Sequence, residues 1–212
     1  MTTTTTDART KGDAAAHRSF LNTYYGISRH FYDVTRKYYL FGRDRVLKDL
    51  ALEDWSSLVE IGPGTGRNLG MLHEMRPDAR LGGVEASDEM LKHARRKCPW
   101  ATLEQGFAED ADLERLMGKK PDRILYSYCL SMVQKPVEAL ETARRALAPG
   151  GEVVVVDFAN LAGMPPLARR GLRKWLETFH VEPLDENLLR QQDARISYGP
   201  GHYYLVGRMG PL

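Results

Sequence analysis

Short apolar runs alternate with amphipathic stretches from about residue 55 to residue 158. The apolar runs predict strands at residues 58–61, 81–84, 101–104, 123–127 and 153–156. Helical patterns occupy residues 67–75 and 137–147, and a third helix opens after Ser87, whose hydroxyl suits an N-cap. Residues 153–156 are all valine, as expected for a parallel strand buried on both faces. This alternation predicts a parallel sheet covered by helices on both sides.

The last two strand-like runs follow a different pattern. Residues 194–198 and 202–208 are separated by Gly199-Pro200-Gly201, which predicts a tight turn and an antiparallel hairpin at the sheet edge. The expected fold is therefore α/β: a Rossmann-like, mostly parallel seven-stranded sheet with an antiparallel C-terminal hairpin. Strand 81–84 is the weakest prediction because it contains two glycines.

Composition limits the class of protein and its partners. The chain has 212 residues, enough for one ordinary domain, and its 30 basic and 28 acidic side chains give no case for nucleic acid as a partner. The six histidines show no metal-ligand spacing, so no metal site is expected. Cys98 and Cys129 belong to no paired motif and fit reduced thiols in a cytoplasmic protein. We expect neither a signal peptide nor a membrane-spanning helix.

The same patterns predict three regions. Residues 1–16 are small and polar and are expected to form a disordered tail. Residues 17–50 are rich in tyrosine and are expected to form an N-terminal helical lid. Residues 51–212 contain the alternating strands and helices and are expected to form the ligand-binding domain.

A glycine loop joins the first predicted strand to its helix. Gly62, Gly64 and Gly66 lack side chains, so the backbone there can approach a ligand closely. Glu85 lies 19 positions after Gly66, at the end of the second strand, where a carboxylate can accept both ribose hydroxyls of an adenosine. The usual dinucleotide motif has a small residue where this chain has Arg67, which favours an adenosine ligand without phosphate. Glu60 can meet a ligand ammonium or bind N–H groups of the loop, and both interpretations stay open.

These residues resemble a known family. Glu60-Ile61-Gly62-Pro63-Gly64-Thr65-Gly66 resembles the first motif of class I S-adenosylmethionine (SAM)-dependent methyltransferases, Glu85 matches their ribose-binding acid, and residues 147–151 match the turn before their fifth strand. The resemblance implies SAM as co-substrate. The residues expected to bind it are Tyr25, Arg43, Glu60, Gly62, Gly64, Gly66, Asn68, Glu85, Ala86, Met90, Phe107, Ala108, Glu109 and Ser127.

A closer resemblance covers residues 22–182. Segments such as 31–44, 126–132 and 175–181 are similar to bacterial betaine-lipid N-methyltransferases, which methylate the amine of diacylglycerylhomoserine. This implies a small-molecule or lipid amine as acceptor. The chain departs from the family after the third strand, where Phe107 replaces an aspartate that reads the adenine amino group. Either Glu109 or a backbone carbonyl takes that role, and Phe107 can stack on the base.

The tyrosines of the expected lid suggest where transfer takes place. On a helix, Tyr25, Tyr32 and Tyr39 share one face, which either packs on the sheet domain or presents phenol rings to cations. The second interpretation makes Tyr32, Tyr39 and Tyr128 catalytic. Asp157, after the fifth strand, either accepts the amine proton or binds loop N–H groups. Arg43 can pair with a ligand carboxylate or with Asp44.

Two further questions stay open at this stage. Residues 167–179 combine four basic side chains with Leu and Trp, so they form either a peripheral membrane contact or an ordinary solvated helix face. The chemistry also has rivals. The same scaffold can use the aminocarboxypropyl group of SAM, closing an azetidine ring and releasing methylthioadenosine, or it can bind SAM without turnover.

Overall fold

The computed structural model describes residues 40–178 and 182–212. The expected tail 1–16, the lid residues 17–39 and Tyr25, Tyr32 and Tyr39 therefore lie outside the described residues. The described part of the expected lid includes helix α2 (Arg43–Ala51), whose Val46, Leu47 and Leu50 are buried in the core.

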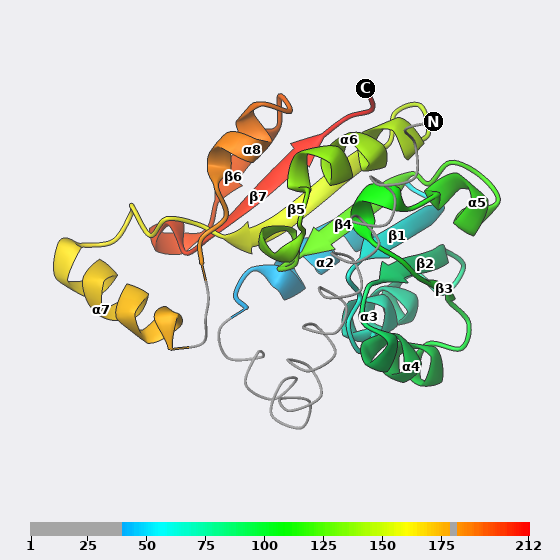
Figure 1. The fold of residues 1–212 in the computed structure, drawn as a ribbon, viewed down its shortest axis with the longest axis horizontal. Coiled ribbons are helices and arrows are strands. Elements are labelled where there is room, and N and C mark those ends of the chain that lie inside the picture. The colour runs from blue at the N-terminus through cyan, green and yellow to red at the C-terminus, as the bar shows by residue number, and fades with distance from the viewer. Residues whose placement is uncertain (1–39, 179–181) are drawn as a thin grey trace, which may run out of the picture.

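Seven strands form one sheet in the order β3-β2-β1-β4-β5-β7-β6 (Figure 1). The first five are parallel, whereas β7 pairs antiparallel with both β5 and β6. The expected fold is confirmed, including the hairpin at the edge. The strands are β1 (Ser57–Ile61), β2 (Arg80–Glu85), β3 (Thr102–Gln105), β4 (Arg123–Ser127), β5 (Glu152–Phe158), β6 (Arg195–Tyr198) and β7 (Tyr204–Met209).

The helices follow the predicted alternation. Helix α3 begins and ends as predicted, and the Ser87 hydroxyl caps α4 by accepting from Met90 N at 3.4 Å. The Gly-Pro-Gly turn is longer than predicted, because a 3₁₀ turn, η3 (Pro200–His202), precedes β7. The remaining elements are α3 (Arg67–Met75), α4 (Asp88–Lys97), η1 (Ala108–Asp110), α5 (Leu113–Met117), η2 (Leu130–Met132), α6 (Pro136–Ala146), α7 (Pro166–Glu177) and α8 (Glu186–Arg190).

The core has two layers, one on each face of the sheet. In β5, Val153 and Val155 pack against the layer under α5, α6 and α8, whereas Val154 and Val156 pack against the layer under α2 and α3. Both faces of the strand are therefore dry, which explains its continuous run of valine. This burial fixes the carboxyl ends of β1, β2 and β4 side by side, where ligands of such sheets bind.

Candidate functional site

The glycine loop leaves β1 and enters α3 with left-handed backbone. Gly64 has φ +57°, and a Cβ there would meet no atom within 4 Å, so the loop is open on that side. Gly66 has φ +80°, and a Cβ there would lie 2.9 Å from Cys98 Sγ. A side chain at Gly66 would be both strained and crowded, which explains why glycine occupies the entry to α3.

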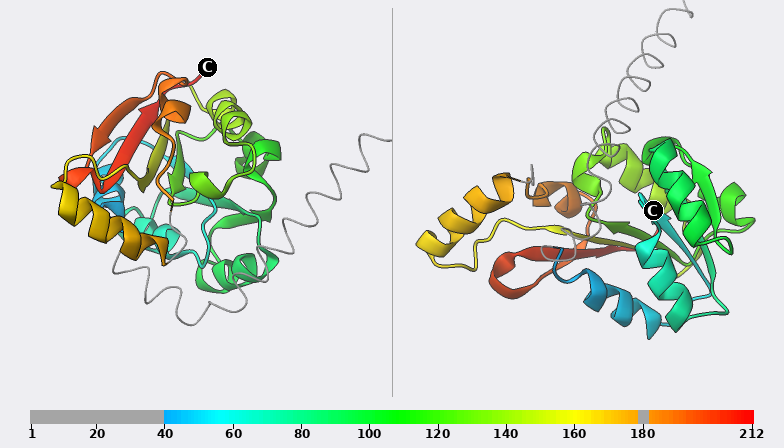
Figure 2. Two further views of the ribbon diagram at one scale, coloured as in Figure 1. Left: turned by 60° about the vertical axis from the view of Figure 1, so that its left-hand side comes forward. Right: turned by 90° about the horizontal axis from the view of Figure 1, so that it is seen from below.

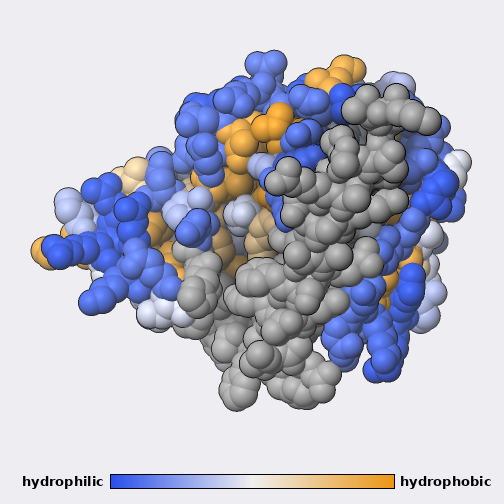
Figure 3. Space-filling view, in the orientation of Figure 1, coloured by the Kyte–Doolittle hydropathy of each residue, from blue (hydrophilic) through white to orange (hydrophobic). Residues whose placement is uncertain are grey.

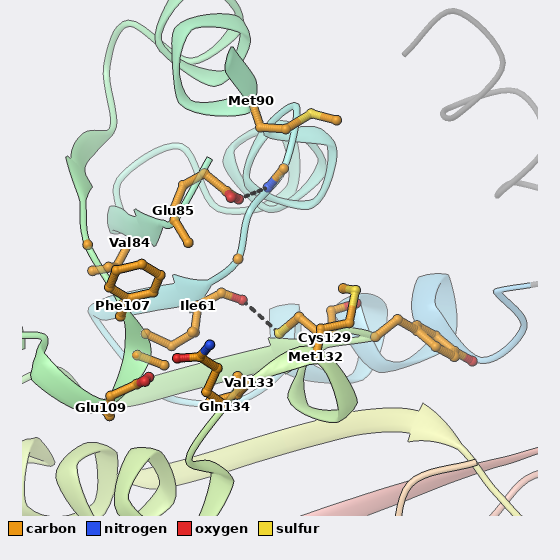
Figure 4. Close-up of a pocket in the computed structure, with 17 residues that line it drawn as sticks. Ile61, Val84, Glu85, Met90, Phe107, Glu109, Cys129, Met132, Val133 and Gln134 are labelled. Carbon is orange, nitrogen blue, oxygen red and sulfur yellow. Dashed lines mark hydrogen bonds between the residues drawn. The ribbon is translucent and has the colours of Figure 1, made fainter. Parts of the chain in front are cut away.

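Glu85 ties this loop to the next helix. Its Oε2 accepts a hydrogen bond from Gly64 N (Figure 4), and its Oε1 accepts one from Ser87 N, both at 2.9 Å. The carboxylate is buried at the end of β2 and points toward the cleft beside the loop. Glu85 therefore lies at the end of β2, where the sequence predicts a carboxylate that accepts ribose hydroxyls.

Glu60 and Asn68 form a buried polar pair behind the loop. Asn68 Nδ2 donates to Glu60 Oε1 at 2.6 Å. Glu60 is only 1% exposed, and burial raises the pKa of its carboxyl to about 8 although Asn68 and Arg43 act in the opposite direction. Within the described chain, Glu60 Oε2 and Asn68 Oδ1 have no hydrogen-bond partner. Two buried acceptors without donors are costly, and a ligand cation with several N–H donors would satisfy both.

A partly open cleft with a cavity volume of about 90 Å³ lies at the carboxyl ends of β1, β2 and β4 (Figure 4). Its lining includes two carboxylates, Glu85 and Glu109, and no lysine, arginine or histidine among the described residues. The lining residues are Ile61, Gly62, Gly64, Val84, Glu85, Ala86, Met90, Gly106, Phe107, Ala108, Glu109, Ser127, Tyr128, Cys129, Met132, Val133 and Gln134.

The segment after β3 closes one end of the cleft. Phe107 presents its ring to the cleft, and the Glu109 carboxylate lies near Gln134 (Figure 4). The backbone carbonyl of Glu109 accepts from Thr142 Oγ1 at 3.1 Å, which leaves its side chain for the cleft. Both expectations for this segment are thus compatible with the geometry: a stacking Phe107 and a polar contact from Glu109.

Tyr128 and Asp157 flank the other end of the cleft in different ways. Tyr128 has φ +55° and lines the cleft, but its hydroxyl donates to the Phe41 carbonyl, and burial raises its pKa. The hydroxyl is therefore engaged away from the cleft. Asp157 is buried and does not line the cleft. Its Oδ1 accepts a hydrogen bond from Phe158 N at 2.9 Å, which is one of the two roles that the sequence predicted for it. Burial raises the pKa of the Cys129 thiol, and the charge of Asp157 raises it further.

Arg43 lies at the start of α2, beside this buried cluster. Its Nε is 3.6 Å from Asp44, while Asp44 also receives two hydrogen bonds from Arg67, at 2.8 and 3.1 Å. The Arg67 guanidinium accordingly lowers the pKa of Asp44. Arg43 also lowers the pKa of Glu60, so its charge reaches the pair behind the loop.

The structure separates the expected cofactor residues into two groups. Gly62, Gly64, Glu85, Ala86, Met90, Phe107, Ala108, Glu109 and Ser127 line the cleft, as does Tyr128. Arg43, Glu60, Gly66, Asn68 and Asp157 do not line it. The predicted site did not include the stretch after β4, at the same edge of the sheet, from which Cys129, Met132, Val133 and Gln134 line the cleft. The position of this stretch directly after a parallel strand was a usable signal.

The described residues hold neither a candidate membrane span nor a candidate metal cluster. No helix there is long and apolar enough to cross a membrane. No group of three or more histidine, cysteine, aspartate or glutamate side chains in residues 40–178 and 182–212 is placed to hold a metal ion.

The described residues form a Rossmann-like sheet with an acidic cleft beside a glycine loop, at the edge where ligands of such sheets bind. Comparison with known proteins shows what this part of the chain is similar to. Residues 59–153 match the family model of a methyltransferase domain. A TehB-like SAM-dependent methyltransferase from Corynebacterium glutamicum has the same fold, with a TM-score of 0.61 and 16% identity over 88% of this chain and 99% of that chain. Residues 59–153 therefore resemble a methyltransferase domain, and the described fold is one that SAM-dependent methyltransferases have.

Curated relatives that are named as methyltransferases differ in substrate. The demethylmenaquinone methyltransferase of Thermus thermophilus is 33% identical over 147 residues, 66% of this chain and 65% of that protein. A dTDP-3-amino-3,4,6-trideoxy-alpha-D-glucopyranose N,N-dimethyltransferase of Streptomyces venezuelae is 36% identical over 104 residues, 47% of this chain and 41% of that protein. The chain spans 35% to 65% of the length of the curated relatives that it matches.

Proposed function

We propose that this protein transfers the methyl group of SAM to the nitrogen of an amine. The observation that carries the proposal is the charge of the site. Two carboxylates, Glu85 and Glu109, line the cleft, Asp157 is buried near it, and its described lining holds no basic side chain. Such a site favours a cation over a carboxylate. An N,N-dimethyltransferase among the relatives agrees with an amine acceptor.

The described residues fit SAM at three points. Glu85 would exchange its Gly64 and Ser87 hydrogen bonds for ribose hydroxyls. Glu60 Oε2 and Asn68 Oδ1 would accept hydrogen bonds from the ammonium of the methionine part. Both buried oxygens would then have the partners that they lack in the described chain. Phe107 and Met90 would pack on the adenine, with Glu109 or a backbone carbonyl reading its amino group. Gly62, Ala86 and Ala108 would complete the contact surface.

Bound SAM supplies an electrophilic methyl group, so the protein needs little acid–base chemistry. Its residues must hold the amine in line with the transferred carbon and exclude water. A protonated amine must first lose a proton, which Asp157 or water would accept. The Tyr128 hydroxyl is a poor proton acceptor because burial raises its pKa and keeps it protonated. The proposed roles of Tyr32 and Tyr39 as cation-binding rings rest on the sequence pattern, and both residues lie outside the described residues.

For the acceptor we propose an amine carried by a lipid. The resemblance to betaine-lipid N-methyltransferases supports this choice and favours the homoserine amine of a betaine-lipid precursor. A lipid acceptor requires that the cleft reach a membrane surface, which places a cytoplasmic protein in contact with the membrane.

An acceptor panel tests the proposal. The protein is incubated with SAM carrying a labelled methyl group and with diacylglycerylhomoserine, a soluble amino sugar or a tricarboxylic acid. We expect label on nitrogen in the homoserine lipid and none on the acid. Labelling of a carboxylate or carbon acceptor instead would contradict N-methylation. Labelling of the amino sugar alone would contradict only the choice of a lipid.

A further inference from the structure

Helix α7 (Pro166–Glu177) has two chemically different faces. At about 100° per residue, its four cations fall within an arc of about 140°. Glu177 is the only acid in the helix and lies in the same arc. The cations are Arg169, Arg170, Arg173 and Lys174.

Packing against the body fixes which face is outward. Leu176 is buried in the core layer under α2 and α3, and Leu172 packs against the same layer. Lys174, Leu167 and Arg170 lie opposite these two leucines on the helix, whereas Arg169 lies next to Leu176. Arg170, Arg173 and Lys174 are consequently exposed, and Arg169 is partly exposed.

The basic face has no counter-charge within the described chain. No ion pair there involves Arg169, Arg170, Arg173 or Lys174, although many other basic side chains on the surface have acidic partners. Two large apolar side chains of the helix are also exposed. Leu167, next to Lys174, is 88% exposed, and Trp175, about 100° further around the helix, is 44% exposed. A basic arc followed around the helix by exposed leucine and tryptophan is typical of helices that lie in the interface of an anionic bilayer.

The position of α7 agrees with this use. It follows the carboxyl end of β5 through residues 159–165 and stands apart from the sheet (Figures 1 and 2). Hydrophilic surface covers its outer side, with hydrophobic patches next to it (Figure 3). The cleft also opens at the carboxyl edge of the sheet. A membrane contacted by α7 would therefore lie on the side where an acceptor enters.

We infer that α7 is a docking surface for an anionic lipid bilayer, bound through its four cations with Leu167 and Trp175 at the headgroups. This inference uses only the described surface and does not depend on methyl transfer or on the acceptor. Each cation near an anionic surface contributes to binding, so neutralising all four should weaken binding by roughly 100-fold or more. Nucleic acid is a poorer match because exposed leucine and tryptophan add nothing to phosphate binding.

Vesicle co-sedimentation of the full chain tests the inference. The vesicles are phosphatidylcholine alone or phosphatidylcholine with one third phosphatidylglycerol. We expect the protein to bind the anionic vesicles at low salt, to be released from them by high salt and not to bind the neutral vesicles. The test variant replaces Arg169, Arg170, Arg173 and Lys174 by Gln, which leaves the buried Leu176 in place.

A matched control removes the same charge elsewhere. Lys92, Arg95, Arg96 and Lys97 in the second half of α4 are replaced by Gln. We expect only the α7 variant to lose vesicle binding, while both variants keep the thermal shift that SAM causes in the wild type. Absence of wild-type binding, an equal loss in both variants, or binding to oligonucleotides instead of anionic vesicles would each overturn the inference.

Trp175 fluorescence gives a second readout that does not need the variant to fold. In a Trp100→Phe background, Trp175 is the only exposed tryptophan among the described residues, because Trp55 is buried. We expect a blue shift with anionic vesicles and quenching by brominated lipid. An unchanged spectrum in the presence of vesicles that sediment the protein would contradict docking through α7.

Discussion

The Asn68 amide donates to Glu60 Oε1 across 2.6 Å, and the other two side-chain oxygens of the pair are buried without a hydrogen-bond partner in the described chain. Arg43 on α2, Arg67 on α3 and Glu85 on β2 all act on the same carboxyl group. Desolvation dominates and holds the pKa of Glu60 at about 8. At neutral pH the free protein therefore keeps a proton on Glu60, and a bound ammonium would displace it.

This linkage predicts that SAM binding is pH-dependent. Below its pKa of about 8, Glu60 must release a proton to accept a cation, so affinity should rise with pH from about pH 6 to about pH 8. The slope approaches tenfold per pH unit when the proton is fully displaced. Calorimetry in buffers of different ionisation enthalpy would report the released proton. The Glu60→Gln variant should bind more weakly and lose the slope, whereas a wild type with pH-independent affinity would contradict the linkage.

The same group should make the free protein less stable in alkali. Because the folded-state pKa of Glu60 is raised, the folded chain holds its proton more tightly than the unfolded chain does. The free energy of unfolding therefore falls as pH rises from near 4.5 to about 8 and stays low above that. Glu60→Gln should raise stability by roughly 1–3 kcal/mol at alkaline pH and by less in acid. Melting curves of both proteins across pH test this, and an equal effect at every pH would contradict it.

Glu85 should be needed for binding of the nucleoside. Its carboxylate accepts two backbone N–H bonds that order the loop and the start of α4. Glu85→Gln keeps one acceptor oxygen, so affinity for S-adenosylhomocysteine should fall roughly tenfold or more. Glu104→Gln is the matched control because Glu104 only forms an exposed pair with Arg115. Calorimetric titration should show little change for the control, and equal affinities for both variants would count against the assigned role.

Substitution by alanine should have opposite effects on stability at two glycines, one at the start of α3 and one within it. Gly66→Ala places a Cβ at φ +80° and 2.9 Å from Cys98 Sγ, so it should destabilise the protein by about 1–3 kcal/mol. Gly70 lies within α3, and a Cβ there would meet nothing within 4 Å. Gly70→Ala should therefore stabilise the protein by about 0.5–1 kcal/mol. Chemical denaturation of the two variants measures both, and a neutral Gly66→Ala would show that the loop tolerates side chains.

The sequence predicted the positions of the strands because burial and periodicity are local signals. It underrated β2, whose Gly82 and Gly83 allow Met117 and Pro63 to approach, with a Cβ at these positions 2.6 and 3.0 Å from their side chains. These glycines serve close packing rather than a break in the strand.

The site was predictable in part. Motifs located Glu85, Gly64 and Phe107 because each follows a strand at a fixed offset. They did not reveal Met132, Val133 and Gln134, because a short 3₁₀ turn after β4 returns that stretch to the cleft. The orientation of the Tyr128 hydroxyl toward Phe41 was equally beyond prediction, since it depends on a contact between residues distant in the chain.

The most direct test of methyl transfer is to identify the nucleoside formed from SAM by mass spectrometry, with and without an amine acceptor. The acidic cleft and the buried Glu60–Asn68 pair lead us to expect S-adenosylhomocysteine, formed only when the acceptor is present. Release of methylthioadenosine without an acceptor would contradict methyl transfer and would show that the aminocarboxypropyl group reacts.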